Sequence, residues 1–76
     1  MKTNDLKHYS KIVYEVLGED KIKNLHRLQE QSLNNQLHDL LEEHSGDVGT
    51  ITKDEIIGRY ELVTKHIYPN DFLDLI

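Results

Sequence analysis

Apolar residues recur at intervals of three and four in three separate stretches of this sequence, and this spacing restricts its fold more than any other feature. In the first stretch they are Leu6, Tyr9, Ile12, Val13, Val16 and Leu17. Because an α-helix turns once in about 3.6 residues, residues spaced in this way share one helical face. A β-strand would instead alternate apolar and polar residues. The sequence therefore predicts an all-α fold.

The first helix is predicted over residues 4–17. Thr3 or Asn4 can cap its first turn, and Asp5 suits the positive end of the helix dipole. Gly18 follows directly and can adopt the left-handed conformation that ends many helices. We expect the helix to stop there.

The second helix is predicted over residues 20–44, with Asp20 as its cap. Its apolar face consists of Ile22, Leu25, Leu33, Leu37, Leu40 and Leu41. Gln29, Ser32 and Gln36 interrupt that face in the middle. We expect one continuous helix, with a break near Asn34–Asn35 as the alternative, because short polar side chains compete for backbone hydrogen bonds.

The third helix follows a loop of small polar residues and glycines over residues 45–50. Thr52 and Glu55 have the spacing of a capping box, in which each side chain bonds the backbone of the other. The apolar face is formed by Ile56, Ile57, Tyr60, Val63 and Ile67. Pro69 ends this helix at the preceding residue, and Asn70 is expected to cap a short final turn. We predict one domain over residues 1–76, a three-helix bundle of amphipathic helices with a C-terminal helical turn.

The chain is short, with 76 residues and no cysteine. A chain of this size buries only roughly 60% of its unfolded surface. Without cysteine it has neither disulfides nor thiolate metal ligands. Its stability must therefore come from helix packing, from a partner, or from a second copy.

Charge is distributed unevenly along the chain, whose net charge is −5. Residues 1–34 carry six Lys/Arg and five Asp/Glu, a charge of +1, whereas residues 35–76 carry three and nine, a charge of −6. An acidic surface repels phosphate backbones, so we expect no nucleic acid partner. No stretch approaches the roughly 18 apolar residues of a membrane span, so we expect a cytoplasmic protein without a membrane partner. The absence of alanine is typical of AT-rich coding sequences, as in phages or low-GC bacteria.

The stretch Gly49-Thr50-Ile51-Thr52-Lys53-Asp54-Glu55 resembles the second half of an EF-hand loop. In that family a glycine makes the sharp turn at position six, and a glutamate at position twelve gives two oxygens to calcium. Gly49 and Glu55 match at this spacing. Positions one, three and five fall on His44, Gly46 and Val48, which lack the expected side-chain oxygens. The resemblance implies an EF-hand-like helix-loop-helix with weak or lost divalent cation binding.

No pattern of catalytic or metal-binding residues occurs in the sequence. The serines have no recognised motif around them, and no glycine-rich phosphate loop is present. The five histidines lack the short paired spacings typical of zinc sites. We therefore predict no enzyme, no cofactor and no metal.

Several apolar residues fall outside the predicted core faces and are candidates for binding a partner. They are Leu28, Leu62, Phe72, Leu73, Leu75 and Ile76. Apolar anchors with a charged rim are typical of helical docking surfaces. We expect a small protein-interaction module, a regulator or inhibitor that binds another protein. A homodimer is also possible, with Gln29 and Gln36 setting the register of an apolar seam.

Overall fold

The computed structural model describes the backbone of residues 2–73 and the side chains of residues 7–73. Its helices are α1 (Lys2–Leu17), α2 (Glu19–Lys23), α3 (Arg27–Glu43), α4 (Lys53–Leu62) and α5 (Asn70–Leu73). A 3-10 turn, η1 (Val48–Thr50), precedes α4, and a π-helical turn, η2 (Val63–Ile67), extends it. The described residues contain no strand, and the predicted all-α fold is confirmed. None of the described helices is long and apolar enough to cross a membrane.

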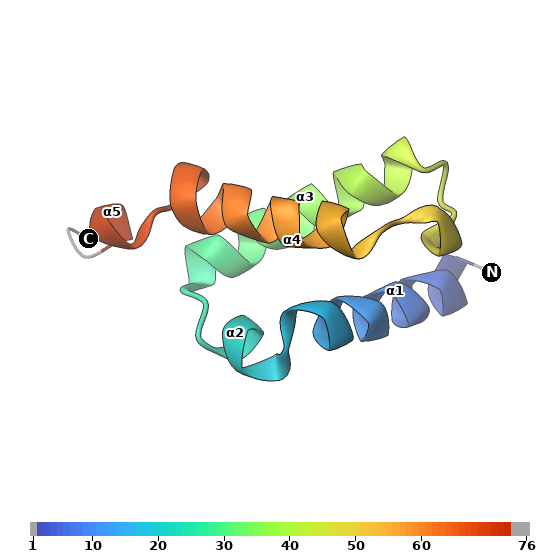
Figure 1. Ribbon diagram of the computed structural model, residues 1–76, viewed down its shortest axis with the longest axis horizontal. Coiled ribbons are helices and arrows are strands. Elements are labelled where there is room, and N and C mark those ends of the chain that lie inside the picture. The colour runs from blue at the N-terminus through green and yellow to red at the C-terminus, as the bar shows by residue number, and fades with distance from the viewer. Residues whose placement is uncertain (1, 74–76) are drawn as a thin grey trace.

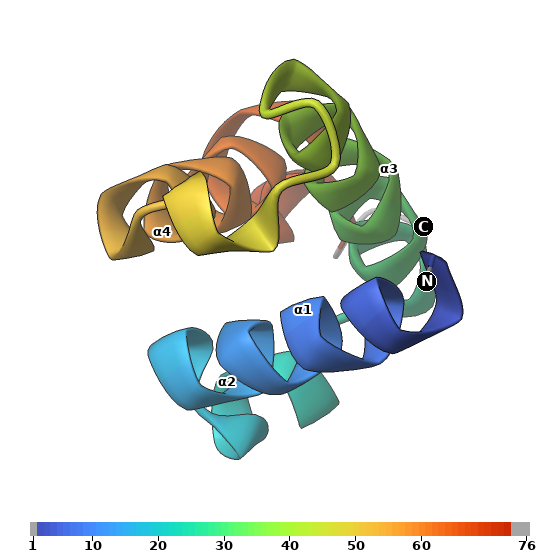
Figure 2. The same cartoon turned by 90° about the vertical axis from the view of Figure 1, so that its right-hand side faces the viewer.

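The helices form two layers (Figures 1 and 2). The antiparallel pair α3 and α4 makes one layer, and α1 with the short α2 makes the other. Helix α4 packs against both α1 and α3, so it joins the two layers. The resulting body is elongated, with extents of 41 × 22 × 20 Å.

The core lies where α4 meets α1 and α3. Ile56 and Val63 of the α4–η2 segment are fully buried, as is Leu40 of α3. Helix α1 contributes Tyr9, Val13 and Leu17, which are four residues apart and therefore lie on one face. The full set is Tyr9, Val13, Leu17, Leu33, Leu37, Leu40, Val48, Ile56 and Val63. Each fully buried aliphatic side chain contributes about 1.5–3 kcal/mol, so this cluster stabilises the packing of the helices.

The prediction of one continuous helix over residues 20–44 is wrong. The chain leaves helical geometry after Asn24 and resumes it at Arg27, between α2 and α3. His26 is extended, its Nδ1 accepts a hydrogen bond from the Leu28 N–H, and its own N–H donates to Gln29 Oε1. These bonds satisfy free N–H groups at a helix start, which makes His26 the cap of a new helix. Helix α3 then runs unbroken through Asn34 and Asn35.

The predicted start of the third helix is confirmed. Thr52 Oγ1 accepts from the Glu55 N–H at 3.2 Å, and Glu55 Oε1 accepts from the Thr52 N–H at 2.9 Å. The predicted stop before Pro69 is also found, because the helix ends at Tyr68. Asn70 differs from the expectation: it is the first residue of α5, and its Oδ1 accepts from Gln29 Nε2 at 3.3 Å. Gly18 has a φ of +90°, the left-handed conformation expected after α1.

Candidate functional site

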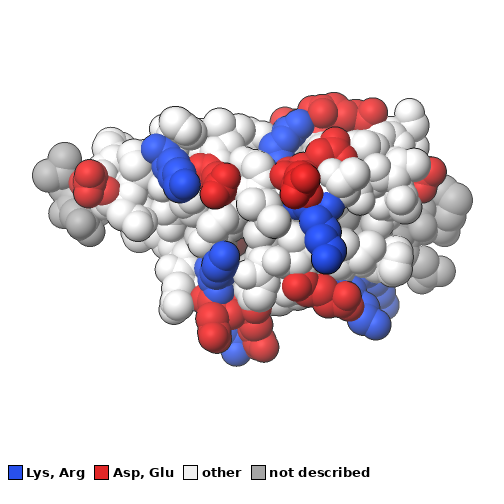
Figure 3. All heavy atoms as spheres, in the orientation of Figure 1, with Lys and Arg blue, Asp and Glu red and all other residues white. Residues whose placement is uncertain are grey.

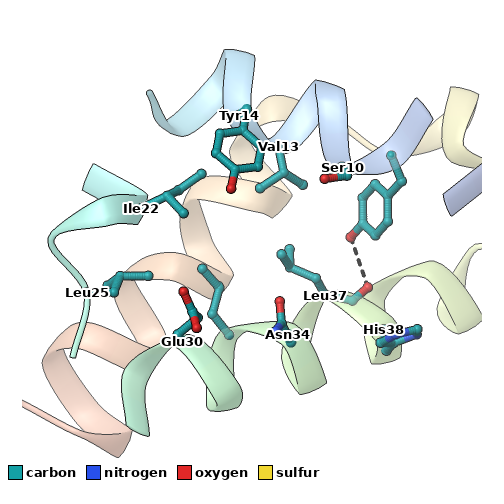
Figure 4. Close-up of a pocket in the computed structure, with 11 residues that line it drawn as sticks. Ser10, Val13, Tyr14, Ile22, Leu25, Glu30, Asn34, Leu37 and His38 are labelled. Carbon is teal, nitrogen blue, oxygen red and sulfur yellow. Dashed lines mark hydrogen bonds between the residues drawn. The ribbon is translucent and has the colours of Figure 1, made fainter. Parts of the chain in front are cut away.

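A groove of about 280 Å³ lies between α1 and α3 (Figure 4). Core side chains form its apolar wall, with Val13 on α1 and Leu33 and Leu37 on α3. Ile22 and Leu25, in and just after α2, line the end near that helix. The groove therefore opens directly onto the hydrophobic core.

The groove separates α1 from α3, which are joined mainly through α4. Helix α4 packs against both α1 and α3. Across the groove itself, the hydroxyl of Tyr9 on α1 donates a hydrogen bond to the carbonyl oxygen of Leu37 at 2.9 Å. Burial raises the pKa of Tyr9 to about 12, because the phenolate would be poorly solvated there. Tyr9 is thus a neutral donor that fixes one end of the groove.

Polar groups surround the mouth of the groove. The Tyr14 hydroxyl, the Glu30 carboxylate and the Asn34 amide point into the space between α1 and α3 (Figure 4). Ser10 and His38 complete the polar lining. Tyr14 is 46% exposed, although it is a large aromatic residue. An apolar wall with a few convergent polar groups is the usual composition of a binding site.

A second, more polar hollow of about 370 Å³ lies where α2 faces the end of α4. Its lining includes Lys21, whose Nζ lies 5.9 Å from the centroid of the Tyr60 ring, close enough for a weak cation–π contact. Gln29 lies at its base and is only 3% exposed. The Gln29 amide donates to the Tyr68 carbonyl oxygen at 2.9 Å and accepts from the His26 N–H. This residue ties the start of α3 to the end of η2.

A histidine and a glutamate join the end of α3 to the start of α4. His44 Nε2 lies 2.8 Å from Glu55 Oε2, and His44 Nδ1 lies 2.8 Å from Thr50 Oγ1. The Thr50 hydroxyl already donates to the Asp47 carbonyl oxygen, so it must accept from Nδ1. The ionised Glu55 carboxylate can only accept. The His44 ring thus bridges Thr50, at the end of η1, and Glu55, in the first turn of α4.

Glu55 has a lowered pKa, chiefly because its carboxylate accepts a hydrogen bond from the Thr52 backbone, and secondarily because of the bond to His44. Its two oxygens are thus engaged within the chain: Oε1 with Thr52 and Oε2 with His44. The EF-hand resemblance implied a different role for Glu55, as a bidentate calcium ligand. Val48, at loop position five, is buried in the core. In the described part of the chain, no group of three or more acidic or histidine side chains is arranged to hold a metal ion.

The partner-binding residues predicted from the sequence lie away from the groove. Leu62 on α4 is 37% exposed and Phe72 on α5 is 46% exposed, whereas Leu28 and Leu73 are half-buried. Leu75 and Ile76 lie outside the described residues.

Two hydrogen bonds indicate how these residues lie relative to one another. Arg59 donates to Gln36 at 3.1 Å, which identifies the flank where α4 meets α3. Leu62 is one turn beyond Arg59, and Leu28 is two turns before Gln36, so helical spacing places both on this flank. The Gln29–Tyr68 bond places the start of α3 beside the segment that leads into α5. Leu28, Leu62 and Phe72 therefore lie toward one end of the molecule.

Charges on the face shown in Figure 3 are mixed. Lys and Arg side chains alternate with Asp and Glu over α4 and α1, and no single-sign stripe crosses this face. Between α4 and α3, one guanidinium nitrogen of Arg59 donates to both carboxylate oxygens of Glu43, at 2.9 and 2.8 Å. Such interspersed charges are typical of a solvated surface.

Sequence reasoning missed the groove and the three polar residues at its mouth. Tyr14 lies off the apolar stripe of α1, and Glu30 and Asn34 lie on the polar side of α3. The sequence pattern therefore predicts that all three are ordinary surface residues. The available signal was Tyr14 itself, because a tyrosine outside the core face is a frequent binding residue. No protein-family model, curated protein or solved structure matches this chain, so the groove is interpreted from its own chemistry.

Proposed function

We propose that this chain is a protein-interaction module on a three-helix bundle, a regulator or inhibitor that binds a partner through the α1–α3 groove. The observation that supports the proposal is the groove itself, an apolar wall of Val13, Leu33 and Leu37 beneath a polar mouth. Partner helices and extended segments bind by inserting apolar side chains into grooves of this composition.

The size of the groove favours a protein segment over a cofactor. Its 280 Å³ falls just below the range of roughly 300–1,000 Å³ that small-molecule sites occupy. One or two apolar side chains of a partner would fill it. Each side chain that becomes fully buried there would contribute about 1.5–3 kcal/mol.

The alternative, an EF-hand-like protein with weak cation binding, has less support because both Glu55 oxygens bond within the chain. The homodimer also has less support, because it was inferred from Gln29 and Gln36 as residues that set the register between two copies. The Gln29 amide bonds Tyr68 and Asn70, and Gln36 accepts from Arg59 of the same chain. Both glutamines thus have partners within the chain.

Photo-crosslinking from two adjacent positions tests the proposal. A benzophenone amino acid replaces Asn34, which faces the groove, or Asn35, which is also exposed but does not line it. We expect a covalent adduct with a partner in the native host from position 34, and little from position 35. Equal adducts from both positions would contradict the assignment of the groove.

A further inference from the structure

Glu30 brings a negative charge into a groove that is otherwise neutral. Of the described residues that line the groove, it alone carries a formal charge at pH 7 when His38 is neutral. Its carboxylate points toward the space between α1 and α3 (Figure 4). No ion pair to Glu30 is found among the described residues, although Arg27 lies one turn away on the same helix. The carboxylate is therefore available to a partner.

The neighbours of Glu30 can assist it in holding a cation. The Tyr14 hydroxyl and the Asn34 amide oxygen can accept hydrogen bonds, and both groups point into the same space as the carboxylate. An ammonium or guanidinium group bound by the Glu30 carboxylate would therefore find further acceptors in the lining of the groove. A carboxylate or phosphate would be repelled by Glu30. A wholly apolar segment would remove water from Glu30 without replacing its hydrogen bonds, which is unfavourable.

We propose that the groove selects a protein segment that carries a lysine or arginine next to an apolar anchor, with Glu30 as the residue that determines this specificity. The inference rests on the proposed function, because it assumes that the groove binds a partner. The apolar anchor contacts Val13 and Leu33, and the cationic group is held by Glu30, Tyr14 and Asn34. The net charge of −5 favours the approach of such a basic segment.

Two small probes separate the charge requirement from the apolar requirement. Phenethylammonium combines an aromatic anchor with a cation, and 2-phenylethanol is its neutral counterpart. Each is titrated into the full chain at constant salt while backbone amide shifts are followed by NMR. We expect saturable shifts at Tyr14, Leu33 and Asn34 with both probes, and tighter binding of the cation.

Three variants identify the residue responsible. Glu30→Gln should weaken phenethylammonium about threefold to fivefold, as expected for a partly exposed ion pair, and leave 2-phenylethanol unchanged. Glu42→Gln is the matched control, since it removes the same charge from an exposed position of α3 outside the groove. It should alter neither affinity. Glu30→Lys should reverse the preference and favour 3-phenylpropionate over phenethylammonium.

The outcomes distinguish this inference from the proposed function. If both probes bind in the groove but Glu30→Gln and Glu42→Gln behave alike, the selection of a cation is wrong and groove binding stands. If neither probe gives saturable shifts at the groove residues, both proposals are overturned. Because Glu30 is exposed, we expect its variants to fold normally, which an unchanged pattern of shifts for core amides verifies.

Discussion

At the scale of single residues, Tyr9 connects the two layers through one buried hydroxyl group. It donates to the Leu37 carbonyl oxygen, and burial raises its pKa to about 12. In the unfolded chain the pKa is near 10, so folding favours the neutral phenol. This contribution to stability is complete below pH 10 and is lost as the pH rises from about 10 to about 12.

We therefore expect the free energy of unfolding to fall across that alkaline range, and Tyr9→Phe to remove part of the fall. The tyrosinate absorbance of the folded protein should show one group that titrates near pH 12, absent in Tyr9→Phe. Tyr14→Phe is the control, because Tyr14 is exposed. Loss of the high-pH titration in Tyr14→Phe instead would show that the wrong tyrosine was assigned.

Glu55 makes the stability of the fold depend on pH in the acid range, where stability is lost as the pH falls. Its pKa is lowered from the ordinary value of 4.5, first by the Thr52 backbone hydrogen bond and then by His44. The folded state therefore favours the ionised carboxylate. Its contribution to stability is present above pH 4.5 and is lost as the pH falls through the lowered pKa. We expect Glu55→Gln to show a shallower loss of stability on acidification than the wild type, measured by urea unfolding at a series of pH values.

The exposed Glu42 provides the control for this acid transition. Glu42→Gln should retain the wild-type slope, because the Glu42 carboxylate forms no ion pair among the described residues. Equal slopes for Glu55→Gln and the wild type would mean that the bonds of Glu55 to Thr52 and His44 do not favour its ionised form.

At the scale of elements, the start of α4 depends on the capping box. Thr52→Ala removes the hydroxyl that accepts from the Glu55 N–H. We expect it to destabilise the domain by about 1 kcal/mol. Thermal unfolding measures the change. Thr52→Ser retains the hydroxyl, so its free energy of unfolding should lie within about 0.3 kcal/mol of the wild-type value. An unchanged midpoint in Thr52→Ala would contradict the role of this cap.

The helices that the sequence predicts well are those whose ends carry familiar signals. Gly18 ends α1, and Thr52 with Glu55 begins α4, at the positions that their chemistry indicates. The break before α3 escaped prediction because its cap is a histidine, and histidine is not among the residues that usually cap helices. Ile22 and Leu25 also continue the apolar spacing of α3 across the break, so periodicity alone favours one helix.

The groove was less predictable than the helices. It depends on the distance between α1 and α3, which is set by how α4 packs against both of them. Helical spacing shows which residues share a face but not how far apart two faces lie. Glu30 and Asn34 are polar residues on a polar side of a helix, and only their position opposite Tyr14 distinguishes them (Figure 4).

At the scale of the whole molecule, two surfaces can serve association independently. The groove lies between α1 and α3, whereas Leu62 lies on the flank where α4 meets α3. A molecule of 8.9 kDa has a small core and needs most of its apolar side chains to form it. Apolar side chains that remain exposed are therefore candidates for contacts with a second copy or with another protein.

Leu62 on α4 is 37% exposed although it is a large apolar residue. We expect Leu62→Asp to change the free energy of unfolding by no more than about 0.5 kcal/mol, as for most surface substitutions, while weakening self-association or partner capture. Removal of residues 71–76, which include the exposed Phe72, should likewise weaken association and leave the free energy of unfolding nearly unchanged. Urea unfolding measures the first quantity, and sedimentation equilibrium with partner capture measures the second.

Ile57 supplies the matched control for Leu62. It lies on the same helix and is 38% exposed, but helical spacing places it on the opposite flank of α4. Ile57→Asp should therefore preserve association at similar stability. If Leu62→Asp unfolds the domain, Leu62 belongs to the core and its exposed edge is incidental. If Ile57→Asp and Leu62→Asp weaken association equally, the effect comes from added charge, and the α3–α4 flank is not an interface.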